Sequence, residues 1–64
     1  MQFTLKAIRI NNNMSQEEAA KEIGVSVDTL GNYERGKSFP DIPILKKIEE
    51  VYGVKYENIN FFPQ

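Results

Sequence analysis

The sequence predicts an all-α protein, a compact bundle of five short helices. Apolar residues recur three and four positions apart, and alternation of apolar and polar residues never persists long enough to indicate a strand. Serine or aspartate precedes three of the helical segments as an N-cap, and a glycine follows each of these three. With 64 residues, the chain is expected to form one domain, residues 1–64.

The first helix is expected to begin after Thr4, whose hydroxyl is suited to an N-cap. Leu5 and Ile8 are three residues apart and therefore share the helix face that packs against the core. Asparagine favours turns and tolerates positive φ, so the three asparagines at 11–13 are expected to end this helix.

The second and third helices carry the clearest signals in the chain. Ser15 and Glu18 form a capping box that begins the second helix, and Gly24 suits the left-handed position that ends it. Ser26 caps a third helix that is expected to run to about Arg35. Two helices joined by a tight glycine turn form a helix-turn-helix, at about residues 15–35. Such a unit leaves the start of its second helix projecting, where it can enter the major groove of DNA.

A fourth helix is expected to begin after Asp41 and to end at Gly53, with Pro43 tolerated in its first turn. Its buried stripe is expected to comprise Ile44, Leu45, Ile48, Val51 and Tyr52. A fifth, short helix is predicted from about Tyr56 to Asn60. The residues that this last segment buries are expected to be Val54, Ile59 and Phe61.

The composition excludes several classes of protein. The chain has no cysteine and no histidine, so we expect no disulfide, no metal site, no cofactor and no enzyme activity. No apolar run is long enough to span a bilayer, and the N-terminus lacks the apolar core of a signal peptide. We therefore expect a cytoplasmic protein with neither a membrane nor a small-molecule substrate as its partner. The net charge of −1 is unusually low for a nucleic-acid-binding protein.

The segments MSQEEAAKEIGVS, YERGKSFP and LKKIEEVYGV together resemble the Cro/C1-type, XRE-like helix-turn-helix family, which includes the lambdoid phage repressors. The resemblance runs from Leu5 to about Phe61. It implies a lambda-repressor-like bundle of five helices that binds double-stranded DNA and regulates transcription. It further implies a homodimer on a palindromic operator, with the third helix reading the bases.

The same resemblance assigns roles to individual residues. It implies base contacts from Ser26, Val27, Asp28 and Asn32. It implies contacts to backbone phosphates from Gln16, Lys37 and Ser38, with Lys6, Asn12 and Asn13 as weaker candidates. It also implies that Arg9 and Glu34 form a structural ion pair. An asparagine amide can pair with adenine through two hydrogen bonds, which makes Asn32 the best candidate for direct readout.

Some assignments stay open at this stage. Asp28 either accepts a hydrogen bond from cytosine or only compensates the dipole of its helix. Gly31 is unfavourable in the middle of a helix, and either permits a close approach to DNA or leaves the helix soft. The low net charge and the apolar residues Phe61 and Phe62 allow an alternative function, a protein-interaction or antitoxin-like module with weak or no DNA binding. Phe62 is a candidate for covering a dimer partner.

Overall fold

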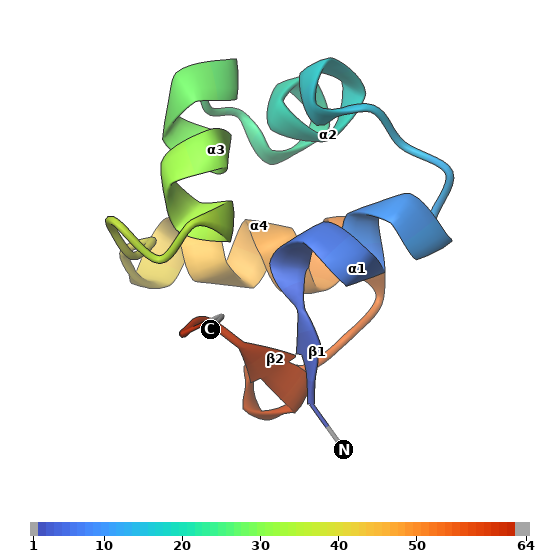
Figure 1. Ribbon diagram of the computed structural model, residues 1–64, viewed down its shortest axis with the longest axis vertical. Helices are drawn as coiled ribbons and strands as arrows, with labels where there is room; N and C mark the ends of the chain where they lie inside the picture. The colour runs from blue at the N-terminus through green and yellow to red at the C-terminus, as the bar shows by residue number, and fades with distance from the viewer. Residues whose placement is uncertain (1, 63–64) are drawn as a thin grey trace.

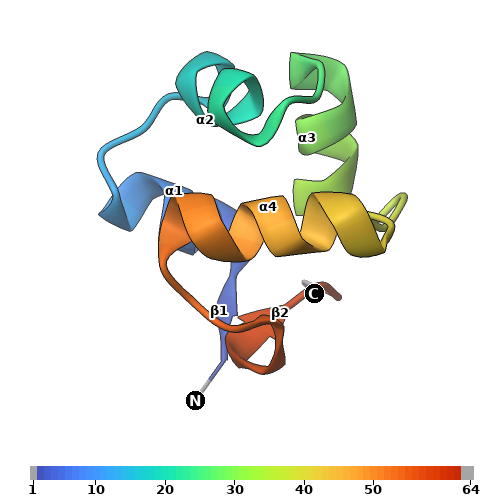
Figure 2. The same ribbon diagram turned by 180° about the vertical axis from the view of Figure 1, so that it is seen from behind.

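The computed structural model describes residues 2–62 and is mostly helical. Figure 1 shows α2 and α3 above α1 and α4, and Figure 2 shows α4 crossing the opposite side of the molecule from α1. In the described part of the chain, no helix is both long and apolar enough to cross a membrane. The α-helices are α1 (Leu5–Asn11), α2 (Gln16–Ile23), α3 (Val27–Glu34) and α4 (Ile42–Tyr52).

The predicted helix starts and ends are confirmed by backbone hydrogen bonds. In each of the four caps the side-chain oxygen accepts the N–H of the residue three positions later, and Ser15 and Glu18 complete a capping box. Gly24 and Gly53 end α2 and α4 in the left-handed conformation, with φ of 92° and 67°. The helix boundaries therefore follow from local hydrogen bonding and from the freedom of glycine. The capping residues are Thr4, Ser15, Ser26 and Asp41.

The core lies where α2 packs against α3 and α4. Ala19 and Ala20 are fully buried, and their small side chains let the neighbouring helices come close to α2. Of the stripe predicted for α4, Ile48 and Tyr52 are buried, whereas the other three residues are half-buried. The largest fully buried side chains are Leu5, Ile23, Leu30 and Ile48.

The prediction of a fifth helix at residues 56–60 is wrong. Residues Tyr56–Asn58 form one turn of 3₁₀-helix, η1, and Ile59–Asn60 form a strand, β2. This strand pairs in parallel with β1 (Phe3–Thr4), with Phe3 opposite Ile59. Residues 2–62 thus form four α-helices and a two-stranded sheet, which Figure 1 shows below α1 and α4.

The last turn does not extend into a helix because its hydrogen-bonding partners lie elsewhere in the fold. The N–H of Tyr56 donates to Glu49 Oε2 of α4 at 2.8 Å, and the following backbone finds partners in β1. A helix of a few residues gains too few internal hydrogen bonds to compete with this pairing. Ile59 is buried as predicted, but as a strand residue, and Val54 and Phe61 pack half-buried against the core.

Tyr52 places a hydroxyl in the interior. The Tyr52 side chain belongs to the core, and its hydroxyl is buried without a hydrogen bond to any of the residues 2–62. Burial raises the pKa of Tyr52 to about 12, and the nearby Glu34 carboxylate adds to this rise while Arg9 opposes it. The folded state therefore holds this phenol in its neutral form at a pH where an unfolded chain ionises it.

Replacing Tyr52 by phenylalanine tests this environment. Because the hydroxyl has no partner, Tyr52→Phe is expected to change the free energy of unfolding at pH 7 by less than about 1 kcal/mol. From about pH 10 to about 12, wild-type stability should fall, since only the unfolded chain loses the Tyr52 proton there. The variant should lose less stability over this range, as measured by urea denaturation at pH 7, 9 and 11.

Tyr56→Phe is the matched control, because Tyr56 is 58% exposed and its variant should keep the wild-type alkaline loss. A Tyr52→Phe protein that is several kcal/mol less stable at pH 7 would contradict the prediction.

Candidate nucleic-acid interface

The turn between α2 and α3 presents the start of α3 at the surface. Gly24 donates its N–H to the carbonyl of Ala20 at 2.8 Å, and only Val25 separates it from Ser26, the cap of α3. On one side of α3, Leu30 is buried in the core. Because the turn is short and the core side of the helix is packed, the opposite side of α3 faces solvent (Figure 1).

The exposed face of α3 carries the residues predicted to contact bases. Val27 is 38% exposed, Asp28 is exposed and Asn32 is half-buried. Ser26 differs from them, because its hydroxyl already accepts the N–H of Thr29 and donates to Thr29 Oγ1 at 2.8 Å. Ser26 therefore stabilises the start of α3 and keeps little hydrogen-bonding capacity for a base.

A buried ion pair joins α1 to α3. Arg9 Nε donates to Glu34 Oε2 at 2.7 Å, and the two side chains are only 10% and 4% exposed. Arg9 Nη1 also donates to the carbonyl of Met14 at 2.9 Å, and Gln16 Nε2 donates to Glu34 Oε1 at 3.0 Å. The structure thus brings the two residues of the expected pair together and adds Gln16, the first residue of α2, as a third member.

Beside this ion pair lies a polar hollow of about 580 Å³ between the starts of α1 and α2 and the exposed side of α3. Arg9 and Glu34 neutralise each other, so the charges left free at the hollow are those of Lys6 and Arg35. The first N–H groups of α2 also have no partner within the helix. The hollow is therefore suited to an anion. Its lining residues are Lys6, Arg9, Ser15, Gln16, Gly31, Glu34 and Arg35.

Lys37 and Ser38 follow the end of α3. Gly36 adopts a φ of 75° and donates its N–H to the Tyr33 carbonyl, while Lys37 donates its N–H to the Asn32 carbonyl at 2.9 Å. This pattern is a Schellman motif, which ends the helix and fixes the direction of the chain beyond it. Lys37 is exposed and Ser38 is half-buried, so both candidates lie at the C-terminal end of α3.

Asn12 and Asn13 lie apart from the other candidates. The end of α1 that carries them points away from α3 in both Figure 1 and Figure 2. Asn12 Nδ2 donates to the Ile8 carbonyl at 2.8 Å, and Asn13 takes a positive φ of 59°. These two residues end α1 and turn the chain towards α2, which is the local role that asparagine favours.

Arg35 is a residue of this surface that the sequence analysis named only as the approximate end of the third helix. Its guanidinium lines the hollow, and its Nη2 donates to Asn32 Oδ1 at 2.8 Å. The signal was present in the spacing, since Arg35 is three residues after Asn32 and four after Gly31. Side chains at these separations meet on one helix face, so the contact could have been expected.

Two carboxylates near the start of α2 accept hydrogen bonds within the fold. Glu34 accepts from Arg9 and Gln16, and Glu18 accepts from Ser15 in the capping box. The hydrogen bonds from Ser15 lower the pKa of the Glu18 carboxyl. Within residues 2–62 no group of three carboxylates gathers in a way that could hold a metal ion.

Comparison with known proteins identifies the family. The sequence pattern of the helix-turn-helix family matches residues 5–59. An uncharacterised HTH-type transcriptional regulator of Archaeoglobus fulgidus is 38% identical over 64 residues, covering 100% of this chain and 90% of the relative. A similarly named protein of Methanocaldococcus jannaschii is 41% identical over 59 residues, which are 92% of this chain and 89% of that protein. The cryptic phage CTXphi transcriptional repressor RstR of Vibrio cholerae is 34% identical over 50 residues, 78% of this chain and 45% of RstR. No solved structure gives a significant match.

The chain therefore belongs to the helix-turn-helix family, in its Cro/C1-type branch. Proteins of this class bind DNA and regulate transcription, and that is the function of this chain. The expected resemblance to the family is confirmed, whereas the five-helix count that it implied is wrong.

Breaking the Arg9–Glu34 pair is expected to destabilise the fold. Arg9→Met should lower the free energy of unfolding by roughly 3–5 kcal/mol, because it leaves the buried Glu34 carboxylate without its cation. The double variant Arg9→Met/Glu34→Met should recover much of this loss, since no charge then remains buried. Urea denaturation at pH 7 measures both.

Lys47→Met is the control for a lost charge, because the Lys47–Glu50 pair is exposed and 4.0 Å long. We expect Lys47→Met to lower the free energy of unfolding by less than about 1 kcal/mol. If Arg9→Met costs no more than this control, the buried pair does not hold the fold together.

Proposed function

We propose that this chain acts in the cytoplasm as a transcriptional repressor that occupies a palindromic operator as a homodimer. The observation that carries the proposal is the solvent-facing side of α3 beside a hollow suited to an anion. An α-helix fits the major groove, which is about 12 Å wide, while flanking cations bind the phosphates. RstR, to which this chain is similar, is named a transcriptional repressor, and this supports repression as the mode of regulation.

The base-reading residues lie at the exposed start and middle of α3. We assign base contacts to Val27, Asp28 and Asn32, with Ser26 mainly as the helix cap. The apolar side chain of Val27 suits the methyl group of thymine, and the Asp28 carboxylate can accept from the amino group of cytosine. The Asn32 amide offers both a donor and an acceptor to a base edge.

The phosphate contacts come from three neighbouring segments. Gln16 and Lys6 line the hollow, and Lys37 with Ser38 extends the surface past the end of α3. Gln16 has one N–H of its amide on Glu34, so the second N–H remains for a phosphate. Asn12 and Asn13 are left out of the proposal because they lie at the far end of α1.

The proposed DNA-binding surface carries few cations, which argues for a dimer. If each protomer neutralises about three to five phosphates, the slope of log affinity against log salt is about −5 to −9 for a dimer. One short helix also contacts few base pairs, and a second copy on the other half-site doubles the number of contacts. We therefore expect weak binding by a single protomer and specific binding only by two.

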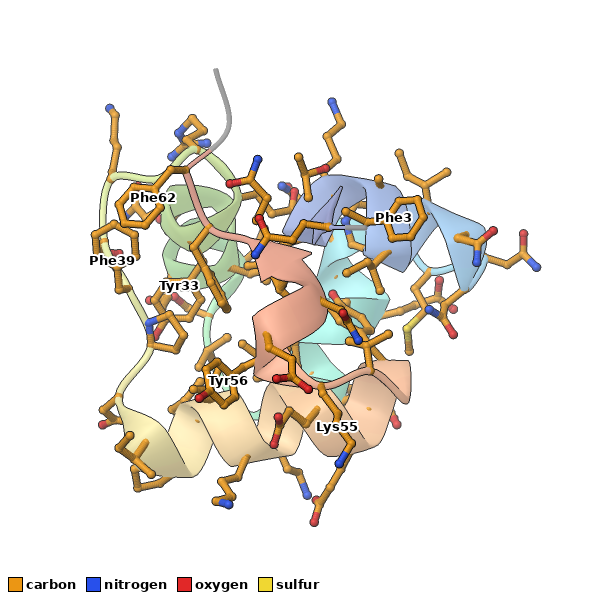
Figure 3. The ribbon with its side chains drawn as sticks, turned by 90° about the horizontal axis from the view of Figure 1, so that it is seen from below. Phe3, Tyr33, Phe39, Lys55, Tyr56 and Phe62 are labelled. Atoms are coloured by element: carbon orange, nitrogen blue, oxygen red, sulfur yellow. The ribbon has the colours of Figure 1, made fainter. Side chains whose placement is uncertain are left out.

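An aromatic patch beyond the end of α3 is our candidate for the dimer contact. The rings of Phe39 and Phe62 lie 5.0 Å apart, and Figure 3 shows them side by side at one edge of the molecule. Phe39 is 50%, Phe62 68% and Tyr56 58% exposed. These side chains line a groove of about 240 Å³. An aromatic side chain buries about 150–250 Å² in full, and half or more of each of these three is still exposed, so the patch supplies a part of the roughly 800 Å² per partner in a standard interface.

Operator binding is tested with duplexes selected from a random pool. The wild-type chain should bind selected duplexes, and the midpoint should move steeply to higher protein concentration as salt rises. Lys37→Glu should weaken binding to every selected duplex by about tenfold or more and reduce the salt slope by about two for a dimer. Fluorescence anisotropy of labelled duplex measures both quantities.

Lys46→Glu makes the same charge change on an exposed residue of α4, which crosses the opposite side of the molecule from α1. This control should have little effect on the affinity for DNA or on the salt slope. Absence of binding at both low and moderate salt would favour the alternative, a protein-interaction module without DNA.

The dimer contact is tested by Phe62→Ala. We expect this variant to sediment as a monomer at concentrations where the wild type is a dimer, because it removes the most exposed ring of the patch. Analytical ultracentrifugation across a concentration series measures the association. Phe3→Ala is the control, because Phe3 is also half-exposed, at 53%, but lies on another part of the surface (Figure 3). An unchanged dimer in Phe62→Ala would remove Phe62 from the interface.

A further inference from the structure

Arg35 folds back along α3 and holds the side chain that faces the bases. Its Nη2 donates to Asn32 Oδ1 at 2.8 Å, one helical turn earlier. Its Nη1 lies only 3.1 Å from the point where a Cβ on Gly31 would be. The terminal nitrogens of the guanidinium therefore lie over Gly31, which is buried, and beside Asn32.

Gly31 makes room for this arrangement. Gly31 has an ordinary helical φ, since the positive-φ glycines are Gly24, Gly36 and Gly53. The backbone conformation at residue 31 therefore does not require glycine. The three atoms nearest to a Cβ at this position all belong to the Arg35 guanidinium, so Gly31 supplies space for that group. This explains a glycine that intrinsic helix propensity disfavours.

The contact also fixes which atoms Asn32 offers to DNA. Pairing with adenine requires Oδ1 to accept from the amino group N6 while Nδ2 donates to N7. Here Arg35 Nη2 occupies one of the two lone pairs of Oδ1, and the other polar groups of the pair are all N–H donors, those of Nδ2 and of the guanidinium. The pair is therefore rich in donors, and an adenine amino group brought to it would have to share Oδ1 with the Arg35 cation.

Guanine offers the matching edge. In the major groove guanine presents two neighbouring acceptors, O6 and N7, whereas adenine presents one acceptor and one donor. We propose that Arg35 and Asn32 read DNA as one donor-rich unit, so that Arg35 makes guanine the preferred base at the position that Asn32 faces. This inference rests on the proposed function and replaces the adenine expected from Asn32 considered alone.

The test compares base preference in the wild type, Arg35→Met and Lys37→Met, each with selected sequences from a random duplex pool. Methionine has an unbranched apolar side chain, like the stem of arginine, but carries no hydrogen-bond donor. Arg35→Met therefore frees Asn32 Oδ1 to accept a hydrogen bond from a base. In the wild type we expect a guanine in each half-site that is preferred over adenine by about tenfold or more. In Arg35→Met this preference should disappear or reverse at that position and stay unchanged at the others.

Lys37→Met is the matched control for a lost positive charge. It should weaken binding to all sequences alike and leave every base preference as in the wild type. Gly31→Ala provides a graded second test, because its methyl group would lie 3.1 Å from Arg35 Nη1 and the guanidinium must shift by a few tenths of an ångström while the arginine remains. This variant should fold with a higher Tm, since alanine favours helix over glycine, and should show a reduced guanine preference.

The outcomes separate the inference from the proposed function. If Arg35→Met keeps the wild-type base preference and loses affinity uniformly, Arg35 is an ordinary phosphate contact and the inference is overturned. A wild type that already prefers adenine at this position overturns it as well. If the wild type selects no sequence at all, the proposed function fails, and this inference fails with it.

Discussion

The orientation of the DNA-facing helix depends on the buried contact between Arg9 and Glu34. The two side chains come from α1 and α3, and Gln16 and the Met14 carbonyl complete their hydrogen bonds from the start of α2 and the loop before it. A charge buried at 4–10% side-chain exposure is tolerated only when it is paired and its remaining donors and acceptors are bonded. The contact therefore ties three helices together at one point, and we expect it to favour one mutual arrangement of them.

Helical spacing divides six of the eight residues of α3 among three tasks. Leu30 and Tyr33 pack in the core, Glu34 holds the ion pair, and Val27, Asp28 and Asn32 remain at the surface. Because the core side and the ion pair immobilise the helix, its exposed side chains start from a rigid base. Rigid placement reduces the ordering cost that a short reading helix would otherwise incur on binding DNA.

The two ends of the described chain meet on the side opposite α2 and α3. Pairing of Phe3–Thr4 with Ile59–Asn60 gives each segment backbone partners that neither could find locally. Gln2 Nε2 adds a hydrogen bond to the carbonyl of Glu57 at 3.1 Å. The short sheet thus closes the bundle below α1 and α4 and leaves the surface of α3 unobstructed (Figure 1).

The sequence by itself determined the helix boundaries, because caps and glycine turns are set by residues a few positions apart. Ser15, Ser26 and Asp41 start their helices as predicted, and the face of α3 that turns inward follows from spacing alone. Only the tertiary structure decided which distant residues come into contact and which rotamers their side chains adopt. The strand at Ile59 depends on a partner 56 positions away, where local propensity carries no information. Asn12 and Asn13 lie away from the exposed face of α3 because of the direction in which α1 packs. Asn32 Oδ1 accepts a hydrogen bond from Arg35 because of the rotamer that Arg35 adopts.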